Sequence, residues 1–485
     1  MHLVENDTPK IGIIGGGFTG AIFAVHLSRA APVRLAMDII EPREEVGAGL
    51  AYGSSSPEHR INVPSDRMVV FAEDRHHFTR WLKHTGKWEA DAEALTPEGH
   101  HYSARHDFAS YMADLVADSA AQNPSGSTIR QIKGAAKHVG KVGGTWRVAL
   151  GDGTSHAYDH LVFCATHAMP AFRWPLVGGA EGLPHLVRDP WQISALTAIP
   201  GDASVLIIGA GLTMSDVVVT LKKHGHRGPI QAIARRALTS RPQGVFDDAF
   251  DLFGGEERPG TALGLLQFVR KRIAEAATRD LSWHAVIDAV RRSLVSYWAT
   301  LPMEERAKIV RHLRSFWDVH RFRMAPQVQI ALARGQSEGW LRLSAGRIHE
   351  IGRNGDRFSV RWTPRGGMRQ IAIADAVINC TGPDSDLTRS SNPLVQSAIA
   401  EGLIRPDALR IGLDVDRDGQ LIDRDGKSNA GLWAAGPLAR IVVGEATGIP
   451  EASAQARHVA AALAASLVAR TDGQHLTQLG SGEIA

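Results

Sequence analysis

Cysteine is almost absent from this chain. The 485 residues include only Cys164 and Cys380, each at the end of an apolar, strand-like run. Two cysteines are too few for a disulfide framework, and their separation rules out a Cys-x-x-Cys redox pair. The sequence therefore excludes a disulfide-rich domain and the flavin reductases that exchange electrons through a dithiol.

Long apolar runs and an excess of one charge are also missing. No segment approaches the roughly 18 apolar residues that a membrane span needs, and residues 1–10 lack the pattern of a secretion leader. The 54 basic and 51 acidic residues leave a formal charge of +3, which favours neither nucleic acid nor an anionic membrane as a partner. We expect a soluble cytoplasmic protein with two or three globular domains that binds a small molecule. Whether it forms a homo-oligomer stays open.

Glycine marks a first dinucleotide-binding fingerprint close to the start of the chain. An apolar strand over residues 11–14 runs into a glycine turn and then into a helix, and the candidate cofactor contacts there are Gly15, Gly17, Phe18, Thr19 and Gly20. Such glycines let the backbone turn sharply and approach a pyrophosphate, whose charge lies at the helix N-terminus. Glu41 ends the next strand, where a carboxylate accepts hydrogen bonds from ribose hydroxyls and repels a 2′-phosphate. This fingerprint predicts FAD or NAD, not NADP.

A second fingerprint follows the strand at residues 205–208. Its candidate cofactor contacts are Gly209, Gly211, Leu212 and Thr213, and Met214 takes the place of the third glycine. The next strand, over residues 230–234, ends in Arg235 and Arg236 instead of an acid. Guanidinium groups pair bidentately with phosphate, so this end favours the 2′-phosphate of NADPH. The alternative is a solvated basic turn.

Two similar strands, over residues 161–166 and 376–382, bracket the second fingerprint. This order predicts an α/β fold with two Rossmann-like dinucleotide-binding domains, the second inserted in the first, and a helical elaboration over residues 280–332. The expected division is a first FAD domain part at 1–195, an NADPH domain at 196–345, a second FAD domain part at 346–470 and a flexible tail at 471–485. Residues 170–201, rich in proline and glycine, are expected to form the crossing linker.

Further motifs accompany the fingerprints along most of the chain. They lie at residues 47–52 (GAGLAY), 60–68 (RINVPSDRM), 188–191 (RDPW), 234–238 (ARRAL), 317–321 (WDVHR), 379–383 (NCTGP) and 435–438 (AGPL). With these motifs the chain resembles the single-chain FAD/NAD(P)-binding monooxygenases that include urate hydroxylase and L-aspartate N-hydroxylase. In the segment at 444–453 it lacks the tryptophan and arginine of many relatives, which leaves the substrate open.

The resemblance implies a flavin monooxygenase of class B type. NADPH reduces FAD, dioxygen adds at the flavin C4a atom, and the hydroperoxyflavin delivers one oxygen atom to a small polar, nitrogen-containing substrate. No catalytic triad, carboxylate pair or metal cluster is needed, because the cofactor supplies the chemistry. The alternatives are an FAD-dependent NAD(P)H oxidoreductase without oxygen transfer and a catalytically idle flavoprotein.

The same resemblance implies the remaining site residues. The candidate catalytic residues are Asn62, Met68, Glu445 and Thr447, and the further candidate cofactor contacts are Arg105, Thr381, Gly382, Gly436, Pro437 and Pro450. Arg105 would contact an FAD phosphate or the substrate, with a surface arginine as the alternative. Pro450 suits the first turn of a helix whose N-terminus can stabilise an anionic flavin. Trp317, His320 and Arg321 share one helix face, for which we favour a plain buried face over a substrate pocket.

Overall fold

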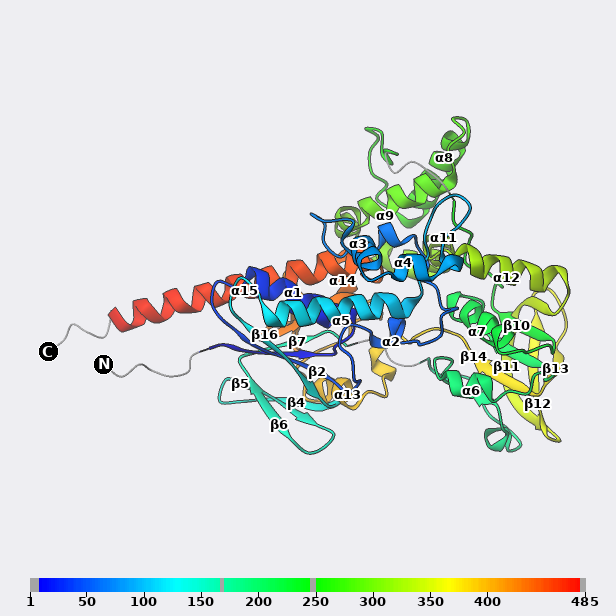
Figure 1. Cartoon of the computed structure of the whole chain (residues 1–485), viewed down its shortest axis with the longest axis horizontal. Coiled ribbons are helices and arrows are strands. Elements are labelled where there is room, and N and C mark those ends of the chain that lie inside the picture. The colour runs from blue at the N-terminus through cyan, green and yellow to red at the C-terminus, as the bar shows by residue number, and fades with distance from the viewer. Residues whose placement is uncertain (1–7, 166–169, 245–249, 480–485) are drawn as a thin grey trace.

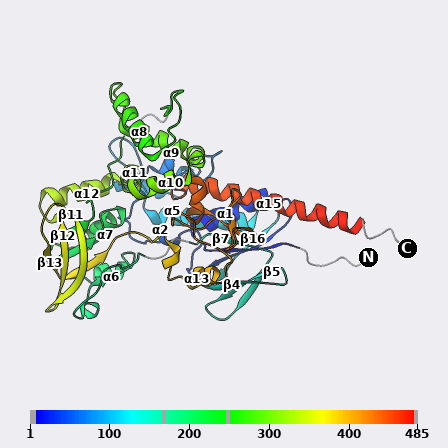
Figure 2. The same cartoon turned by 180° about the vertical axis from the view of Figure 1, so that it is seen from behind.

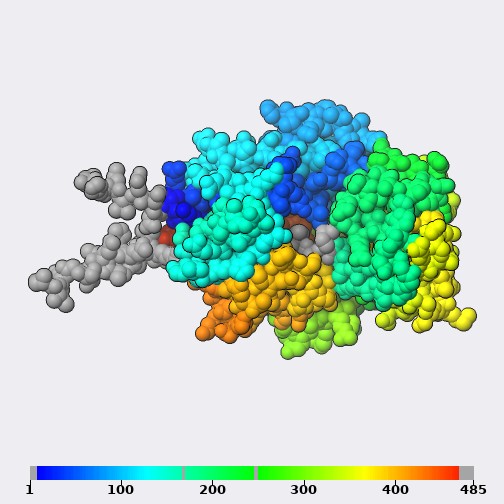
Figure 3. All heavy atoms as spheres, turned by 90° about the horizontal axis from the view of Figure 1, so that it is seen from below, coloured from blue at the N-terminus to red at the C-terminus, as the bar shows by residue number. Residues whose placement is uncertain are grey.

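The structure is a computed structural model that describes residues 8–165, 170–244 and 250–479, with side chains up to residue 468. Its described residues form two α/β domains and a helical lobe (Figure 1). Within them, no helix combines the length and the apolar character that a membrane crossing requires. Figure 3 shows most of the green and yellow middle part of the chain at one end of the molecule.

The first domain is built on a six-stranded sheet in which all neighbours run parallel except the edge pair β15 and β16. Its strands, in spatial order, are β15 (Gln420–Ile422), β16 (Ser428–Ala434), β7 (His160–Phe163), β1 (Lys10–Ile14), β2 (Ala36–Glu41) and β3 (Thr128–Lys133). The central strands are buried on both sides, which explains their continuous apolar runs.

Three helices cover one face of this sheet and a small antiparallel sheet packs near the other. The helices are α1 (Phe18–Ala30), α5 (Arg105–Ala121) and α15 (Ile449–Leu479), and the small sheet contains β4 (Ala136–Val142), β5 (Thr145–Leu150) and β6 (Ser155–Tyr158). Alternation along β1 places Ile11 and Ile13 in the core beneath the helices and Ile14 in the opposite core with Trp146. The long helix α15 runs beside α1 in both views of the chain (Figure 1, Figure 2).

The second domain is built on a seven-stranded mixed sheet. Its strands, in spatial order, are β13 (Gln370–Ala374), β12 (Arg357–Pro364), β11 (Leu341–Asn354), β10 (Ile230–Ala234), β9 (Val205–Ile208), β14 (Ala376–Asn379) and β8 (Leu186–Val187). The first half of β11 pairs in parallel with β10 and its second half pairs antiparallel with β12. Helices α7 (Leu212–Lys223) and α12 (Pro326–Ser337) bury their apolar sides in one core of this domain.

A helical lobe lies between β10 and α12 in the chain and projects from the top of the molecule in Figure 1. It contains α8 (Ala262–Ala277), α9 (Trp283–Thr300), α10 (Met303–Lys308), a π-helical turn (Ile309–Leu313) and α11 (Arg314–Arg321). Trp298 of α9 donates a hydrogen bond from Nε1 to the carbonyl of Ile441, 2.8 Å away in the first domain. The lobe therefore contacts the first domain although it belongs to the inserted part of the chain.

The shorter helices connect these layers. They are α2 (Gly49–Tyr52), α3 (His77–His84), α4 (Lys87–Ala90), α6 (Ile193–Thr197), α13 (Pro393–Ala400) and α14 (Arg440–Val443).

The two-domain α/β fold, the insertion of the second domain and the helical elaboration are confirmed. The strand pairing nevertheless differs from the expected boundaries. Strand β8 at Leu186–Val187 already pairs in the second sheet, within the expected crossing linker, and β12 to β14 stay in that sheet to Asn379. The chain thus enters the second domain before residue 195 and leaves it after residue 345. The second boundary differs because β11 continues from its parallel pairing into an antiparallel meander, and a local sequence pattern cannot assign that meander to a domain. Helix α15 extends to Leu479 into the expected tail, and residues 480–485 lie outside the described part.

Candidate nucleotide sites and a charged cavity

The first glycine turn packs directly against the helix that follows it. Gly15 has a φ of +100°, and a Cβ atom on Gly20 would lie only 1.9 Å from the Gly15 carbonyl oxygen. Helix α1 begins after Gly17, where no side chain caps its first turn. The N–H groups of that turn, including those at Phe18 and Thr19, are thus available to an anion at the carboxyl edge of the sheet.

Glu41 lies at the end of β2 and only 3% of it is exposed. Its Oε2 accepts a hydrogen bond from the Gly16 N–H at 2.8 Å, and its Oε1 accepts from the Arg43 N–H at 3.1 Å. The carboxylate is therefore held directly beside the glycine turn. This is the position from which an acid reaches the ribose of a nucleotide whose pyrophosphate lies at the turn.

A loop of the last third of the chain completes this end of the first domain. A Cβ atom on Gly436 would lie 2.5 Å from Oγ1 of Thr19, and the Gly436 N–H donates to Oε1 of Gln455 at 2.5 Å. Pro437 follows within a 3₁₀ turn. The two predicted contacts at Gly436 and Pro437 are therefore brought to the first turn of α1, about 420 residues away in sequence.

The second glycine turn has the same construction. Gly209 has a φ of +116°, and a Cβ atom there would lie 2.2 Å from the Cys380 carbonyl oxygen. Gly211 precedes α7, whose first turn, at Leu212 and Thr213, also lacks a side-chain cap. Apart from its chain neighbours, no heavy atom of the described residues lies within 4 Å of a Cβ built on Gly211, so this side of the turn is open to them. The open turn and the uncapped helix fit a second pyrophosphate.

Arg235 and Arg236 are exposed after the carboxyl end of β10. Arg236 donates from Nη1 to Oγ of Ser315 at 2.7 Å, and its guanidinium lies 5.2 Å from the ring centre of Phe316 on α11. These contacts hold one arginine in place while leaving it accessible to solvent. Thr381 and Gly382 follow β14, beside the turn at Gly209, and the Thr381 hydroxyl donates to Oδ1 of Asn379 at 2.8 Å.

A cavity of about 140 Å³ lies between the first domain and the helical lobe with its flanking segments. It contains three of the four predicted catalytic residues, Asn62, Met68 and Thr447, together with Pro450 in the first turn of α15. The wall is completed by Tyr52, Val63, Arg67, Gln243, Asp288, Arg291, Arg321, Phe322, Arg323, Gly448 and Ile449. Segments far apart in the sequence therefore form one chamber.

Four arginines line this cavity, and acids lie against them. Arg67 and Arg323 each approach Asp288 at 3.3 Å, and Arg321 approaches Glu451 at 3.2 Å. Burial is the largest influence on Arg323 and lowers its pKa in spite of the neighbouring Asp288. The chamber combines fixed charges of both signs with the apolar side chains of Met68 and Ile449.

Glu445, the fourth predicted catalytic residue, lies behind this wall. Its Oε1 is 3.4 Å from Nη2 of Arg321 and accepts a hydrogen bond from the Thr447 hydroxyl at 3.0 Å. Trp317 donates from Nε1 to its Oε2 at 3.3 Å. Glu445 is 6% exposed, and its contacts with Arg321 and Thr447 connect it to the cavity wall.

The structure also brings in residues that sequence analysis missed or interpreted differently. We favoured a plain buried face for Arg321, which is 7% exposed and also lines the cavity. Asp288, Arg291 and Arg323 come from the helical lobe and its exit and were not predicted as site residues. The helical spacing of Trp317 and Arg321 was the one available signal, because it placed both on the same face.

Arg105 forms a different contact from the two that we considered. It starts α5, and its Nη1 and Nη2 donate to the two oxygens of Asp216 on α7, at 2.7 and 3.2 Å. Its side chain is 12% exposed and is therefore no surface arginine. The pair joins the first domain to the second.

The two cysteines lie apart. Cys164 follows β7 in the first sheet and Cys380 follows β14 in the second, and burial raises the pKa of both thiols. Neither has the exposure or the lowered pKa of a reactive cysteine.

The molecule thus has the fold of a protein with two dinucleotide-type domains, and a cavity lies between the first of them and the helical lobe. Residues 12–168 match the family of domains described as FAD-NAD(P)-binding, while curated protein sequences gave no match. Three solved structures show the fold. L-lysine 6-monooxygenase from Pseudomonas syringae has a TM-score of 0.64 and 17% identity over 93% of this chain and 98% of its own. Ornithine N-hydroxylase from Kutzneria sp. 744, solved with reduced FAD, NADP⁺ and L-ornithine, has a TM-score of 0.59 and 14% identity over 96% and 100%. Thioredoxin reductase from Lactococcus lactis has a TM-score of 0.50 and 12% identity over 96% and 100%.

Proposed function

We propose that this protein is an FAD- and NADPH-dependent monooxygenase that hydroxylates a small polar, nitrogen-containing substrate. One observation carries the proposal. Two helices, α1 and α7, each begin without a side-chain cap at a glycine turn, and a charged cavity lies between the first domain and the helical lobe that is inserted in the second. This is the arrangement needed to bring a nicotinamide and a flavin together.

The residues that end or follow β2 in the first domain and β10 in the second support the choice of cofactors. Glu41 places a buried carboxylate beside the first turn, which favours FAD there and disfavours a 2′-phosphate. Arg235 and Arg236 present guanidinium groups after β10, which favours NADPH at the second turn. The match of residues 12–168 to FAD-NAD(P)-binding domains agrees with the first choice.

The cysteines distinguish between the enzymes that share this fold. Thioredoxin reductases and N-hydroxylating monooxygenases both resemble the chain. A dithiol reductase needs two thiols that can meet, whereas Cys164 and Cys380 are buried in different sheets. This difference supports oxygen transfer over dithiol exchange.

The charged groups of the cavity support a small polar substrate. Arg67, Arg291, Arg321 and Arg323 surround it together with Asp288, so an ionised or strongly dipolar molecule meets partners of both signs. The named activities of the two monooxygenases with this fold are on the amino acids lysine and ornithine, which carry an amine. They support a nitrogen-containing substrate here.

The bound flavin would supply the oxidative chemistry, because its reduced form activates dioxygen for transfer of one oxygen atom. The protein residues position and shield it. Met68 and Ile449 line the cavity with apolar groups that keep water out. The first turn of α15, at Pro450, points a helix N-terminus at the cavity and favours negative charge there. Asn62 is held by Gln243, whose Nε2 donates to the Asn62 carbonyl at 2.6 Å.

The test combines three measurements on the purified protein: bound FAD, NADPH oxidation and oxygen uptake, each recorded with a panel of amines, amino acids and nitrogen heterocycles. We expect one panel member to stimulate NADPH oxidation and to give a product that is heavier by one oxygen atom. NADPH oxidation that yields only hydrogen peroxide with every panel member would favour the oxidoreductase without oxygen transfer. Protein that binds no FAD would refute the proposal.

A further inference from the structure

Helix α7 of the second domain is attached to the first domain by a buried ion pair. Arg105 and Asp216 form two hydrogen bonds at 2.7 and 3.2 Å, with side-chain exposures of 12% and 8%. Arg105 also donates from Nε to the Arg60 carbonyl at 3.1 Å, so its guanidinium is fixed from both sides. A planar bidentate pair of this kind sets orientation as well as distance.

A second contact lies one helical turn further along α7. His59 and Thr220 join at 2.8 Å between Nε2 and Oγ1, and the other ring nitrogen of His59 is 2.7 Å from Oγ of Ser54. Asp216 and Thr220 are four residues apart and therefore share one face of α7. The Arg105 N–H donates to the His59 carbonyl at 2.8 Å, so both contacts start from one connected segment of the first domain.

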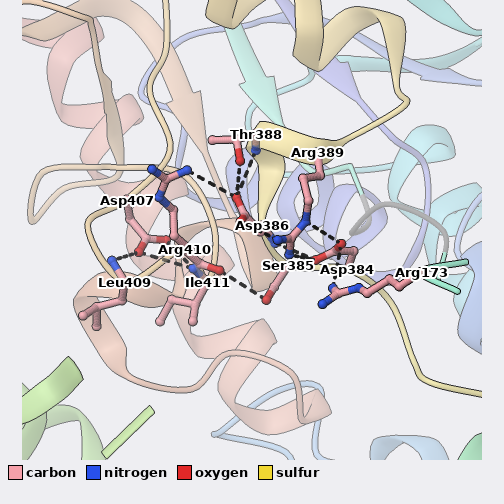
Figure 4. A network of polar contacts seen from close by, with 10 residues as sticks. All are labelled: Arg173, Asp384, Ser385, Asp386, Thr388, Arg389, Asp407, Leu409, Arg410 and Ile411. Atoms are coloured by element: carbon pink, nitrogen blue, oxygen red, sulfur yellow. Dashed lines mark hydrogen bonds and ion pairs between the residues drawn. The ribbon is translucent and has the colours of Figure 1, made fainter. Parts of the chain in front are cut away.

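The two chain segments that connect the domains are joined by an ion pair at another place. Arg173, after β7, approaches Asp384, after β14, at 2.9 Å (Figure 4). Asp384 is 6% exposed and also accepts two hydrogen bonds from Arg389, at 3.1 and 3.2 Å. The second domain is therefore held at its crossings and, independently, along α7.

We propose that the Arg105–Asp216 pair is a positioning device for hydride transfer between the two nucleotides. Asp216 lies one turn into the helix that starts at the second glycine turn, so a shift of this contact moves the turn itself. Arg105 starts α5, whose Phe108 ring lies 4.7 Å from the ring of the cavity residue Tyr52. The pair thus links the frame of the second nucleotide to the cavity wall.

This inference rests on the proposed function. In the step concerned, a hydride with its two electrons leaves the nicotinamide of NADPH, giving NADP⁺, and FAD receives it and is reduced. In this proposal the pair acts on the orientation of the second domain and not on the reacting atoms. It keeps the donor and acceptor atoms at reacting distance, where a displacement of 1 Å can cost roughly a hundredfold in rate.

The test compares Asp216→Asn with Asp38→Asn in the FAD-bound protein. Asp38 is a matched control, since it is also buried and receives two hydrogen bonds from one arginine, Arg130, but lies within the first sheet. The measured quantity is the rate constant of flavin reduction at saturating NADPH without oxygen. We expect Asp216→Asn to lower it at least about tenfold and Asp38→Asn to leave it within about twofold. The reoxidation of chemically reduced flavin by oxygen should be unchanged in both.

Two further measurements separate positioning from general damage. Amide hydrogen exchange should speed up in α7 and around His59 in Asp216→Asn and not in Asp38→Asn. The double variant Arg105→Asp with Asp216→Arg, which restores a reversed pair, should recover at least about half of the lost rate. If Asp216→Asn does not fold, Arg105→Lys, which keeps the charge and loses the bidentate geometry, serves in its place.

Each outcome bears on the proposal. Flavin reduction in Asp216→Asn or Arg105→Lys within about twofold of the parent refutes the positioning role, as does an equal loss in Asp38→Asn. A lowered rate without faster exchange in α7 also refutes it. If the parent protein carries FAD that NADPH never reduces, the proposed function itself fails, and this result is distinct from a parent that is reduced and a variant that is reduced equally fast.

Discussion

Replacing Arg235 and Arg236 together by alanine removes the two guanidinium groups that follow β10, and the expected result is a loss of NADPH affinity with little change for NADH. A hydrogen bond to a charged group contributes about 1.5–3 kcal/mol. Because both side chains are exposed, the lower value applies, so the pair contributes about 3 kcal/mol to binding of the 2′-phosphate. This corresponds to roughly a hundredfold increase in KM for NADPH.

The structure also ranks the two arginines. Arg236 is already held by Ser315 and by the ring of Phe316, so it loses less side-chain freedom when it binds a phosphate. We therefore expect Arg236→Ala alone to account for more of the loss than Arg235→Ala alone.

The assay is the steady-state oxidation of NADPH and of NADH across the single variants, the double variant and Arg342→Ala. Arg342 is an exposed arginine on β11 that pairs with Gln231, about 10 Å from the end of β10 along the strand direction. Its replacement should leave both KM values within about twofold. Equal increases of KM for NADPH and NADH in the double variant, or no increase, would refute the assignment of this strand end.

Three further variants test the rest of the site. Gly211→Ala should fold normally, because a Cβ there meets open space, yet it should weaken NADPH binding at least about tenfold. Gly209→Ala should lower the melting temperature, because Gly209 has a positive φ and a Cβ there would collide with the Cys380 carbonyl. Equal thermal stability of the two variants would contradict this. Arg321→Met removes the partner that Glu445 and Glu451 share, while Glu451 keeps Arg291. The free energy of unfolding in urea should therefore fall by about 1–3 kcal/mol, and an unchanged value would contradict this. Burial lowers the pKa of His26 from 6.5 to about 4, so the unfolded state binds the proton first as pH falls. Up to about 3 kcal/mol of the stability that is present above pH 6.5 is therefore lost between pH 6.5 and pH 4. His26→Gln should flatten this part of the curve of stability against pH, and an unchanged slope would contradict the assignment.

Features that depend on neighbouring residues could be predicted from the sequence. The turn at Gly15–Gly20 and the acid at Glu41 follow from one βαβ unit, in which the spacing of glycines and the length of the strands are local properties. The second turn, at Gly209 and Gly211, was found in the same way. The insertion of one domain in the other followed from the order of these local units.

Features that depend on distant pairings could not be predicted. Arg321 and Glu451 are 130 residues apart, and Arg105 and Asp216 are 111 apart, so neither contact leaves a periodic signal in the chain. The domain boundaries were misplaced for a related reason. Strand β11 belongs to a parallel pair and to an antiparallel pair in succession, and alternation within a strand does not reveal its neighbours.

Helix α8 escaped the sequence analysis because its pattern is weak. Only Ala262, Phe268 and Ala276 of this helix are buried, while Leu263 is 64% exposed. A helix that buries so little does not show the regular apolar stripe on which sequence assignment relies.

Oxygen transfer from dioxygen, driven by NADPH through bound FAD, is the central claim, and labelled dioxygen tests it most directly. Purified protein with FAD, NADPH and a substrate that stimulates NADPH oxidation is incubated under ¹⁸O₂, and the product is weighed by mass spectrometry. The expected product carries one ¹⁸O atom, with one NADPH consumed for each product molecule. An unlabelled product, or NADPH oxidation in which all of the ¹⁸O appears in hydrogen peroxide, would contradict it.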